Sequence, residues 1–232
     1  MDIEIYTLCH QEAPMVPYFM RHYSQYGQVF MFESHSTDRS RQIAEKMGAI
    51  IVDLPTGNEV RDDIFTAMKN NCWRESRADW VIVCDMDEFV YHPDMLEYLE
   101  RLRCTVIAPK TYEMFSDTFP TTKGQIYEEV CYGSPIGSKY FMFKPTEITE
   151  MNFEVGSHSA SPKGNVIIND SPEIICMHMR HLNIDYVVRR NAYFKSRRSQ
   201  INKRNGWGTH VEANRDEIQR WYDVHKQTLI KL

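Results

Sequence analysis

The feature that most constrains this chain is the segment from Trp80 to Pro93, in which an apolar run changes abruptly into acidic residues. Residues 81–84, Val-Ile-Val-Cys, include no charged or strongly polar side chain, which is typical of a strand buried on both faces of a parallel sheet covered by helices. Three carboxylates follow within four positions, at Asp85, Asp87 and Glu88. The segment therefore predicts an α/β fold with acidic side chains at the carboxyl end of a central strand.

Asp85 and Asp87 are placed where open α/β sheets bind their ligands, outside the carboxyl ends of the strands. Two carboxylates one residue apart can hold Mg²⁺ or Mn²⁺ together with the oxygens of a phosphorylated substrate. Such a cation would offset the charge of a departing nucleotide diphosphate. The competing interpretation is that Asp-x-Asp is a common tripeptide and that a turn after a strand favours Asp in any case.

The composition narrows the class of protein. With 232 residues, of which 42% are hydrophobic, the chain is long enough to bury a full core as one domain. The net charge of -5 argues against a general nucleic-acid binder, because such domains are usually basic. The six cysteines include no Cys-x-x-Cys pair, which favours a reducing compartment without disulfides. Neither a signal-peptide pattern nor an apolar stretch of membrane-spanning length is found, so we expect a soluble, cytoplasmic protein without a transmembrane segment.

Strand and helix patterns alternate through the first half of the chain. Strands are expected at 3–8, 29–32 and 49–52, separated by a helix over 15–26 and by a second helix that ends at Met47. This rhythm predicts a parallel sheet with right-handed crossovers. Three further elements are expected before Pro109: helices over 59–76 and 93–102, and a core strand at 104–108.

The character of the sequence changes near Pro109. Residues 110–144 are rich in aromatic residues, Gly and Pro, and alternation at 126–132 and 139–143 predicts short antiparallel strands and substrate loops. A last strand is expected at 174–177. The segment 186–211 contains no Asp or Glu and seven Lys or Arg residues, which usually indicates a solvated helix face but also suits a diphosphate.

Four motifs follow one another along the chain: 8–12 (Leu-Cys-His-Gln-Glu), 36–40 (Ser-Thr-Asp-Arg-Ser), 78–89 with its Asp-Met-Asp-Glu-Phe end, and His178 followed by 185–190. In these motifs the chain resembles the family-2-type glycosyltransferases of GT-A fold. It is most similar to a bacterial and phage branch with a C-terminal Arg-x-Ser-x-x-Asn and Gly-Trp-Gly-x-His signature. Most of that signature is matched here, by Arg198, Ser199 and Asn202 and then by Gly206, Trp207, Gly208 and His210.

The resemblance spans nearly the whole chain and implies one GT-A domain over 1–232. The implied fold is α/β and Rossmann-like, with a mostly parallel sheet flanked by helices, a small antiparallel section and a C-terminal helical tail. Residues 1–109 would form the nucleotide-sugar-binding half, 110–181 the acceptor and metal half, and 182–232 the tail.

The resemblance also implies a metal site for Mn²⁺ or Mg²⁺. Asp85 would contact the donor ribose or a metal-bound water, and Asp87 would bind the cation directly. His178 would complete the metal shell, with His181 as the competing ligand. Two arginines are candidates for assisting the metal, Arg189 and Arg197.

Further donor-binding residues are expected near the nucleotide. By resemblance, His10 lines the nucleotide and Asp38 lies in the turn near the base or ribose, although a helix cap is an equal alternative for Asp38. Arg61 and Asp62 are weaker candidates, since acids in a first helical turn also simply complement the helix dipole.

The implied activity is the transfer of a sugar from a UDP- or GDP-linked donor to a hydroxyl of a glycan or another acceptor, as in glycan or surface polysaccharide synthesis, with no nucleic-acid partner. An inverting reaction needs a group that takes the acceptor proton, whereas a retaining reaction does not. The candidates for this base are Asp117 and His158, then Glu154, Glu113 and His210.

Two other classes remain open. A sugar-phosphate nucleotidyltransferase also uses carboxylates and a metal on an α/β sheet, but it normally carries a Gly-rich, basic loop after its first strand, unlike His10-Gln11-Glu12. A non-catalytic nucleotide-sugar-binding module would bind UDP without any dependence on metal.

Overall fold

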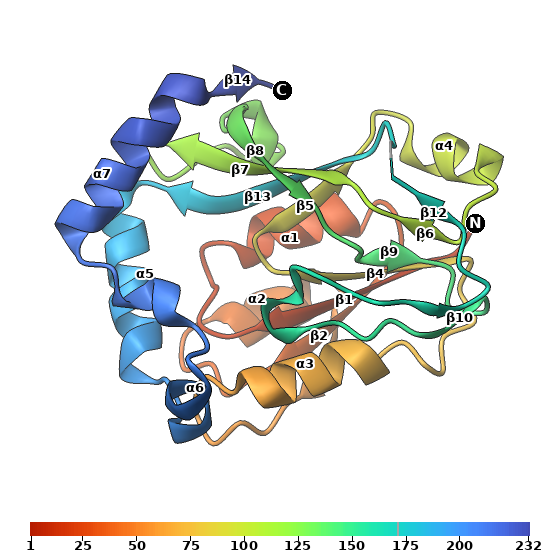
Figure 1. Ribbon diagram of the computed structural model, residues 1–232, viewed down its shortest axis with the longest axis horizontal. Helices are drawn as coiled ribbons and strands as arrows, with labels where there is room; N and C mark the ends of the chain where they lie inside the picture. The colour runs from red at the N-terminus through yellow and green to blue at the C-terminus, as the bar shows by residue number, and fades with distance from the viewer. Residues whose placement is uncertain (171) are drawn as a thin grey trace.

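The computed structural model describes residues 1–170 and 172–232, which form two sheets and the helices around them (Figure 1). Within the described residues, the larger sheet has seven strands in the order β12-β6-β9-β4-β1-β2-β3. Its strands are β1 (Ile3–Cys9), β2 (Gln28–Glu33), β3 (Ile50–Asp53), β4 (Trp80–Asp85), β6 (Val106–Ile107), β9 (Met142–Phe143) and β12 (Ile168–Asn169).

The first half of the chain follows the predicted alternation of strands and helices. Strand β1 pairs in parallel with β2 and β4, and β2 pairs in parallel with β3. The connecting helices are α1 (Val16–Tyr23), α2 (Ser40–Lys46), α3 (Asp62–Asn71) and, after β4, α4 (Met95–Arg101). Strand β9 is antiparallel to both β4 and β6. The α/β architecture with a mostly parallel sheet flanked by helices is confirmed.

Strand β4 is buried on both faces, as the apolar run predicts. Trp80, Ile82 and Cys84 pack into the core on the side of α1, whereas Val81 and Val83 pack with Trp73 and Phe143 on the other side. From Trp80 to Cys84 no side chain is more than 2% exposed. Because both faces are covered, the first solvent-facing position comes only at Asp85, where the strand ends.

A second sheet begins where β4 ends. Within the described residues it has five strands in the order β14-β8-β7-β13-β5. These are β5 (Glu88–Tyr91), β7 (Lys110–Ser116), β8 (Tyr132–Ser138), β13 (Ile175–Leu182) and β14 (Ile230–Lys231). The chain passes from one sheet to the other between Asp85 and Glu88. The pairing of β13 sets His178 opposite Glu88 of β5 on one side and opposite Glu113 of β7 on the other.

The C-terminal part is helical, as expected: α5 (Ile184–Ser196), α6 (Gln200–Asn205), the 3-10 turn η3 (Thr209–Glu212) and α7 (Arg215–His225). Figure 1 shows α5, α6 and α7 together on the side of the molecule away from the N-terminus. None of the helices in 1–170 and 172–232 combines the length and apolar character needed to cross a bilayer.

Some predicted elements of the middle part are wrong. Ile126–Glu128 is a 3-10 turn (η1), not a strand, because Ile126 packs into the core while Tyr127 lies against His22 and Tyr91. The last strand runs to Leu182 rather than ending near His178. Three short elements complete this part, β10 (Ile148–Glu150), η2 (Val155–Ser157) and β11 (Lys163–Gly164), and the 3-10 turn η4 (Lys226–Thr228) precedes β14.

Candidate active site

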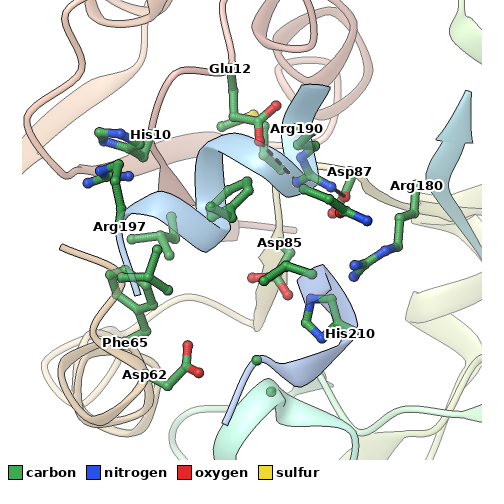
Figure 2. A pocket seen from close by; sticks show the side chains of 18 of the residues that line it. His10, Glu12, Asp62, Phe65, Asp85, Asp87, Arg180, Arg190, Arg197 and His210 are labelled. Atoms are coloured by element: carbon green, nitrogen blue, oxygen red, sulfur yellow. Dashed lines mark hydrogen bonds and ion pairs between the residues drawn. The ribbon is translucent and has the colours of Figure 1, made fainter. Parts of the chain in front are cut away.

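A cavity with a volume of ≈ 210 Å³ lies at the carboxyl ends of β1 and β4. The side chains around it come from both sheets and from the C-terminal helices (Figure 2). His10 and Glu12 follow β1, Asp85 and Asp87 follow β4, and His178 comes from β13. The cavity therefore lies at the edge of the sheet where the sequence predicts the ligand.

Asp87 and His178 face each other in this cavity. The distance between Asp87 Oδ1 and His178 Nε2 is 3.5 Å, and the two residues are only 5% and 6% exposed. His178 Nδ1 lies 3.1 Å from Glu113 Oε1, so this ring nitrogen donates to a carboxylate. Burial alone would lower the pKa of His178, but the carboxylates of Glu113 and Asp87 outweigh it and raise the pKa to about 10.

Arg190 holds the other oxygen of Asp87. Its Nη1 lies 2.9 Å from Asp87 Oδ2, and its Nη2 donates to Glu12 Oε1 at 3.0 Å. Burial opposes the charge on Asp87, yet Arg190 and His178 keep the pKa of Asp87 well below 3.8. Arg190 thus connects the loop after β1 to the end of β4 and fixes the orientation of the Asp87 carboxylate.

His181 lies on the same side of β13 as His178, because the β13–β7 pairing shifts register between these two residues. Its Nε2 lies 3.2 Å from Glu113 Oε2. Burial lowers the pKa of His181 to about 4. Glu113 therefore lies between two histidines: its Oε1 accepts from His178, whereas its Oε2 lies beside His181 without a hydrogen bond among the described residues.

The acidic neighbours of Asp87 are neutralised by two buried lysines. Lys69 of α3 donates to Asp85 Oδ1 at 2.7 Å, and Lys139 forms an ion pair with Glu88. Glu88 Oε2 also accepts the backbone N–H of Asp85 at 2.9 Å. Each carboxylate at the junction of the two sheets therefore has a cationic partner, as charges removed from water require.

His10 is held rigidly at the end of β1. Its Nδ1 donates to the Ser34 carbonyl, and its Nε2 accepts a hydrogen bond from the Tyr193 hydroxyl at 2.8 Å. Burial lowers the pKa of His10. The His10 imidazole is therefore neutral, and its ring has a fixed orientation on the cavity wall.

The C-terminal signature places Asp62 at the rim of the cavity. Asn202 Oδ1 accepts the backbone N–H of Asp62 at 3.1 Å, and Asn202 Nδ2 donates to Asp62 Oδ2 at 2.9 Å. Ser199 caps helix α6 by accepting the N–H of Asn202. Gly208, at φ +69, lets the following turn pass close to Asp62, 3.8 Å from the position of a Cβ.

Several predicted site residues are not brought to the cavity. Asp117 is paired with Lys226 on the surface. Asp38 accepts from Ala13 N and Ser40 N and so joins two loops. Arg61 pairs with Asp63, and Arg189 is exposed. The helix α5 instead presents Arg190 to the cavity.

Of the three remaining candidates for the base, two line the cavity and one lies outside it. His158 and His210 both line the cavity, whereas Glu154 accepts from Ser159 outside it. Neither imidazole forms a hydrogen bond with any residue of the described chain. Burial lowers the pKa of both, and nearby cations add to this, Lys139 for His158 and Arg180 for His210. Both are therefore neutral near pH 7.

The pair Asp87–His178 fits a divalent cation, although the metal site stays a prediction. A separation of 3.5 Å is within reach of two bonds of about 2.1 Å to one ion. Histidines that bind metals usually donate their other N–H to a carboxylate, which is the role of Glu113 here. Within the described residues no three His, Cys, Asp or Glu side chains form a preformed metal site. Mg²⁺ is often bound by one or two carboxylates with substrate phosphates and water, so two protein ligands suffice.

Sequence reasoning missed several cationic and aromatic residues of the cavity. These are Lys139, Arg180, Phe65 and Phe194, together with the acidic residue Glu12. It also missed Lys69, which does not line the cavity but pairs with Asp85. For Arg190 a signal was present, since Val187, Arg190, Asn191 and Phe194 share one face of a helix.

Comparisons with known proteins give likenesses at the level of the backbone. No protein-family model matches the chain, and no curated protein matches it. Among solved structures, TarS of S. aureus matches with a TM-score of 0.47 and 10% identity over 82% of this chain. Glucosyl-3-phosphoglycerate synthase from Mycobacterium tuberculosis, in complex with Mn²⁺ and UDP, matches with a TM-score of 0.35 and 15% identity over 48% of this chain.

A third similar structure is mannosyl-3-phosphoglycerate synthase from Rubrobacter xylanophilus, with a TM-score of 0.35 and 14% identity over 53% of this chain. The matches cover 40%, 43% and 43% of the three solved chains, so the present chain corresponds to less than half of each. The roles of the cavity residues rest on their own geometry.

Proposed function

We propose that this protein is a metal-dependent glycosyltransferase that moves a sugar from a nucleotide-diphosphate donor to an acceptor hydroxyl. The observation that carries the proposal is the buried pair Asp87–His178. Arg190 binds the second oxygen of Asp87, and Glu113 binds the second ring nitrogen of His178. This arrangement holds two ligands in a fixed orientation at the ligand-binding edge of the sheet. Mn²⁺ or Mg²⁺ bound there would neutralise the diphosphate and stabilise it as a leaving group.

The donor fits the side of the cavity near His10. Arg197 lies beside His10 in Figure 2, and its Nη2 is buried without a hydrogen-bond partner in the described chain. A phosphate oxygen would satisfy this N–H group, because guanidinium and phosphate form strong charge-assisted hydrogen bonds. Asp62 and His10, at the same end, are then placed to contact the nucleoside.

The acceptor hydroxyl would approach from the side of His158 and His210. In the transfer, its oxygen bonds to the anomeric carbon, the bond from that carbon to the diphosphate breaks, and the nucleoside diphosphate leaves. A neutral imidazole can take the hydroxyl proton, which makes His158 and His210 the candidate bases for an inverting reaction. Replacing the acting histidine by Asn should lower kcat by about 10²- to 10⁴-fold and leave donor affinity unchanged.

The proposal is tested by substituting Asp87. Calorimetric titration of UDP and GDP, with and without Mn²⁺, should show metal-dependent binding to the wild-type protein. Asp87→Asn keeps the shape of the side chain but removes its charge, so the metal dependence should disappear. Asp94→Asn, an exposed acid outside the cavity, is the matched control and should bind as the wild type does.

Metal-dependent nucleotide binding that survives in Asp87→Asn would contradict the metal assignment. Nucleotide binding by the wild type that never depends on metal would instead favour a non-catalytic binding module. Asp87→Asn leaves the buried Arg190 without one of its charged partners, which destabilises the folded state. Circular dichroism of each variant therefore distinguishes a loss of binding from a loss of the fold.

A further inference from the structure

A second cavity, with a volume of ≈ 520 Å³, lies beside the first. The two cavities share five lining residues: His158, His178, Arg180, Asn191 and His210. A molecule bound in the second cavity therefore lies next to the Asp87–His178 pair without occupying the space near His10 and Arg197.

Arg180 stands at the junction of the two cavities without a counter-ion. It lies on β13, two residues after His178, and it lines both cavities. Its guanidinium forms no hydrogen bond and no ion pair with any residue in 1–170 or 172–232. The nearest carboxylates are already committed, Asp87 to Arg190 and His178, and Glu113 to two histidines. Arg180 is only partly buried, so its unpaired N–H donors face the cavities and can bind an anion there.

Asn191 adds a second unused polar group. Its side chain is on the cavity face of α5 and is only 7% exposed. No described residue forms a hydrogen bond with its amide. Buried amides are normally paired, so this one is expected to bind a ligand that enters the cavities.

The opposite wall of the second cavity is apolar. Val187, Ala213, Ile218 and Trp221 form it. Glu217 also lines this cavity, and its Oε2 accepts the backbone N–H of Asn214 at 2.8 Å. Trp221 is held in place by His181 and His225, each with its ring centroid 4.0 Å away, and by Phe115 at 5.1 Å. A fixed, half-buried indole offers a flat surface on which the apolar face of a sugar ring can stack.

Resting on the proposed function, we infer that the second cavity binds the acceptor and that this acceptor is an anionic sugar. Its carboxylate or phosphate binds Arg180, assisted by Asn191, and its ring lies against Trp221. This places an acceptor hydroxyl at the side of His158 and His210, where the two cavities meet. Arg197, which the proposed function assigns to a donor phosphate, lies on the opposite side of Asp85 from Arg180 in Figure 2, so the two arginines can serve different ligands.

The inference is tested by binding alone, without turnover. Glucose-6-phosphate, glucuronate and glucose are titrated calorimetrically into the wild-type protein, Arg180→Met and Trp221→Leu. Wild-type protein should bind both anionic sugars more tightly than glucose. Arg180→Met should weaken the anionic sugars roughly tenfold to a hundredfold and leave glucose unchanged, because one charge-assisted contact is lost. Trp221→Leu should weaken all three.

The matched control is Arg189→Met, which removes an exposed arginine of α5 outside both cavities and should bind as the wild type does. The two anionic probes separate a preference for phosphate from a preference for carboxylate. Equal affinity of wild-type protein for glucose and for both anionic sugars would overturn the inference. Loss of UDP affinity in Arg180→Met with unchanged binding of the anionic sugars would also overturn it, since Arg180 would then serve the donor.

Failure of the proposed function has a different signature. If no nucleotide binds but the anionic sugars still depend on Arg180, the second cavity is a sugar site and the transferase proposal is the part that fails. If Mn²⁺-dependent UDP binding is found but no variant discriminates between the sugars, the transferase proposal stands and the acceptor assignment falls.

Discussion

The Asp87 carboxylate remains ionised in a nearly dry environment because it belongs to a chain of alternating charges. Glu12 binds Arg190, Arg190 binds Asp87, Asp87 faces His178, and His178 binds Glu113. Each member offsets the desolvation of its neighbours. Removing one member therefore affects more than its own contact, and isosteric neutral substitutions are the informative ones.

A different buried histidine, His22 of α1, predicts a pH dependence of stability. Its Nε2 donates to the Val90 carbonyl at 2.9 Å, and its side chain is fully buried. Burial lowers the pKa of His22 from 6.5 to about 4, so the folded protein favours the neutral ring. As the pH falls from 6.5 towards 4, the unfolded chain takes up this proton before the folded chain does. The free energy of unfolding should therefore decrease over this range, by about 3 kcal/mol from His22 alone.

Urea unfolding of wild-type protein and His22→Gln between these pH values checks the prediction. His22→Gln should be less stable than wild type near pH 7 and should lose less stability on acidification. Other histidines with lowered pKa, such as His181, contribute equally to both curves, so the difference between the curves isolates His22. Parallel curves would contradict this account.

At the scale of elements, α6 acts as a support for the start of α3. Asn202, with a fully buried side chain, bonds both the backbone and the carboxylate of Asp62, and Val60 pairs with Arg198 as an isolated bridge. A signature residue far from Asp62 in sequence thus fixes an acid at the rim of the cavity.

Asn202→Ala should lower the free energy of unfolding by about 1–3 kcal/mol, because it leaves a buried N–H without a partner. It should also weaken nucleotide binding, since Asp62 loses its position. Asn205→Ala removes an exposed asparagine of the same helix and should change stability by less than about 0.5 kcal/mol. Thermal unfolding and UDP titration of both variants give the comparison, and equal effects would show that Asn202 is an ordinary helix position.

Elements with a strong local pattern could be predicted from the sequence. The apolar run of β4, the alternation around it and the acids at its end identified the central strand and the ligand-binding edge. The same patterns failed at 126–132, where alternation reflects contacts of Ile126 and Tyr127 with α1 and β5 rather than a pleat.

The charged partners of the site could not be predicted in this way. Lys69, Lys139 and Arg180 come from three separate elements, and only the pairing of the two sheets brings them near Asp85 and Asp87. The choice between Arg189 and Arg190 depended on the rotation of α5 about its axis. Long-range pairing and helix rotation are tertiary properties, and no local pattern contains them.

For the whole molecule, ligand binding at the junction of two sheets should raise the melting temperature. UDP with Mn²⁺ at 100 times its Kd should stabilise the native protein by about 2.7 kcal/mol, which corresponds to a rise in Tm of roughly 5–10 °C for a chain of this size. UDP alone or Mn²⁺ alone should give a smaller rise, because each completes only part of the site. Thermal-shift measurements on wild type and Asp87→Asn check this, and equal shifts by UDP with and without Mn²⁺ would contradict it.

The passage of the chain between the sheets at 85–88 also bears on how such proteins can be recombined. Asp87 belongs to the segment that leaves one sheet, and His178 belongs to a strand of the other, so each sheet brings one half of the pair. In a chimera that took the two sheets from different parents, Asp87 and His178 would come from different proteins, and their side chains would not have evolved to face each other. A workable crossover point would have to leave this joint and the strand of His178 to a single parent, and exchange only the helical end that closes over them.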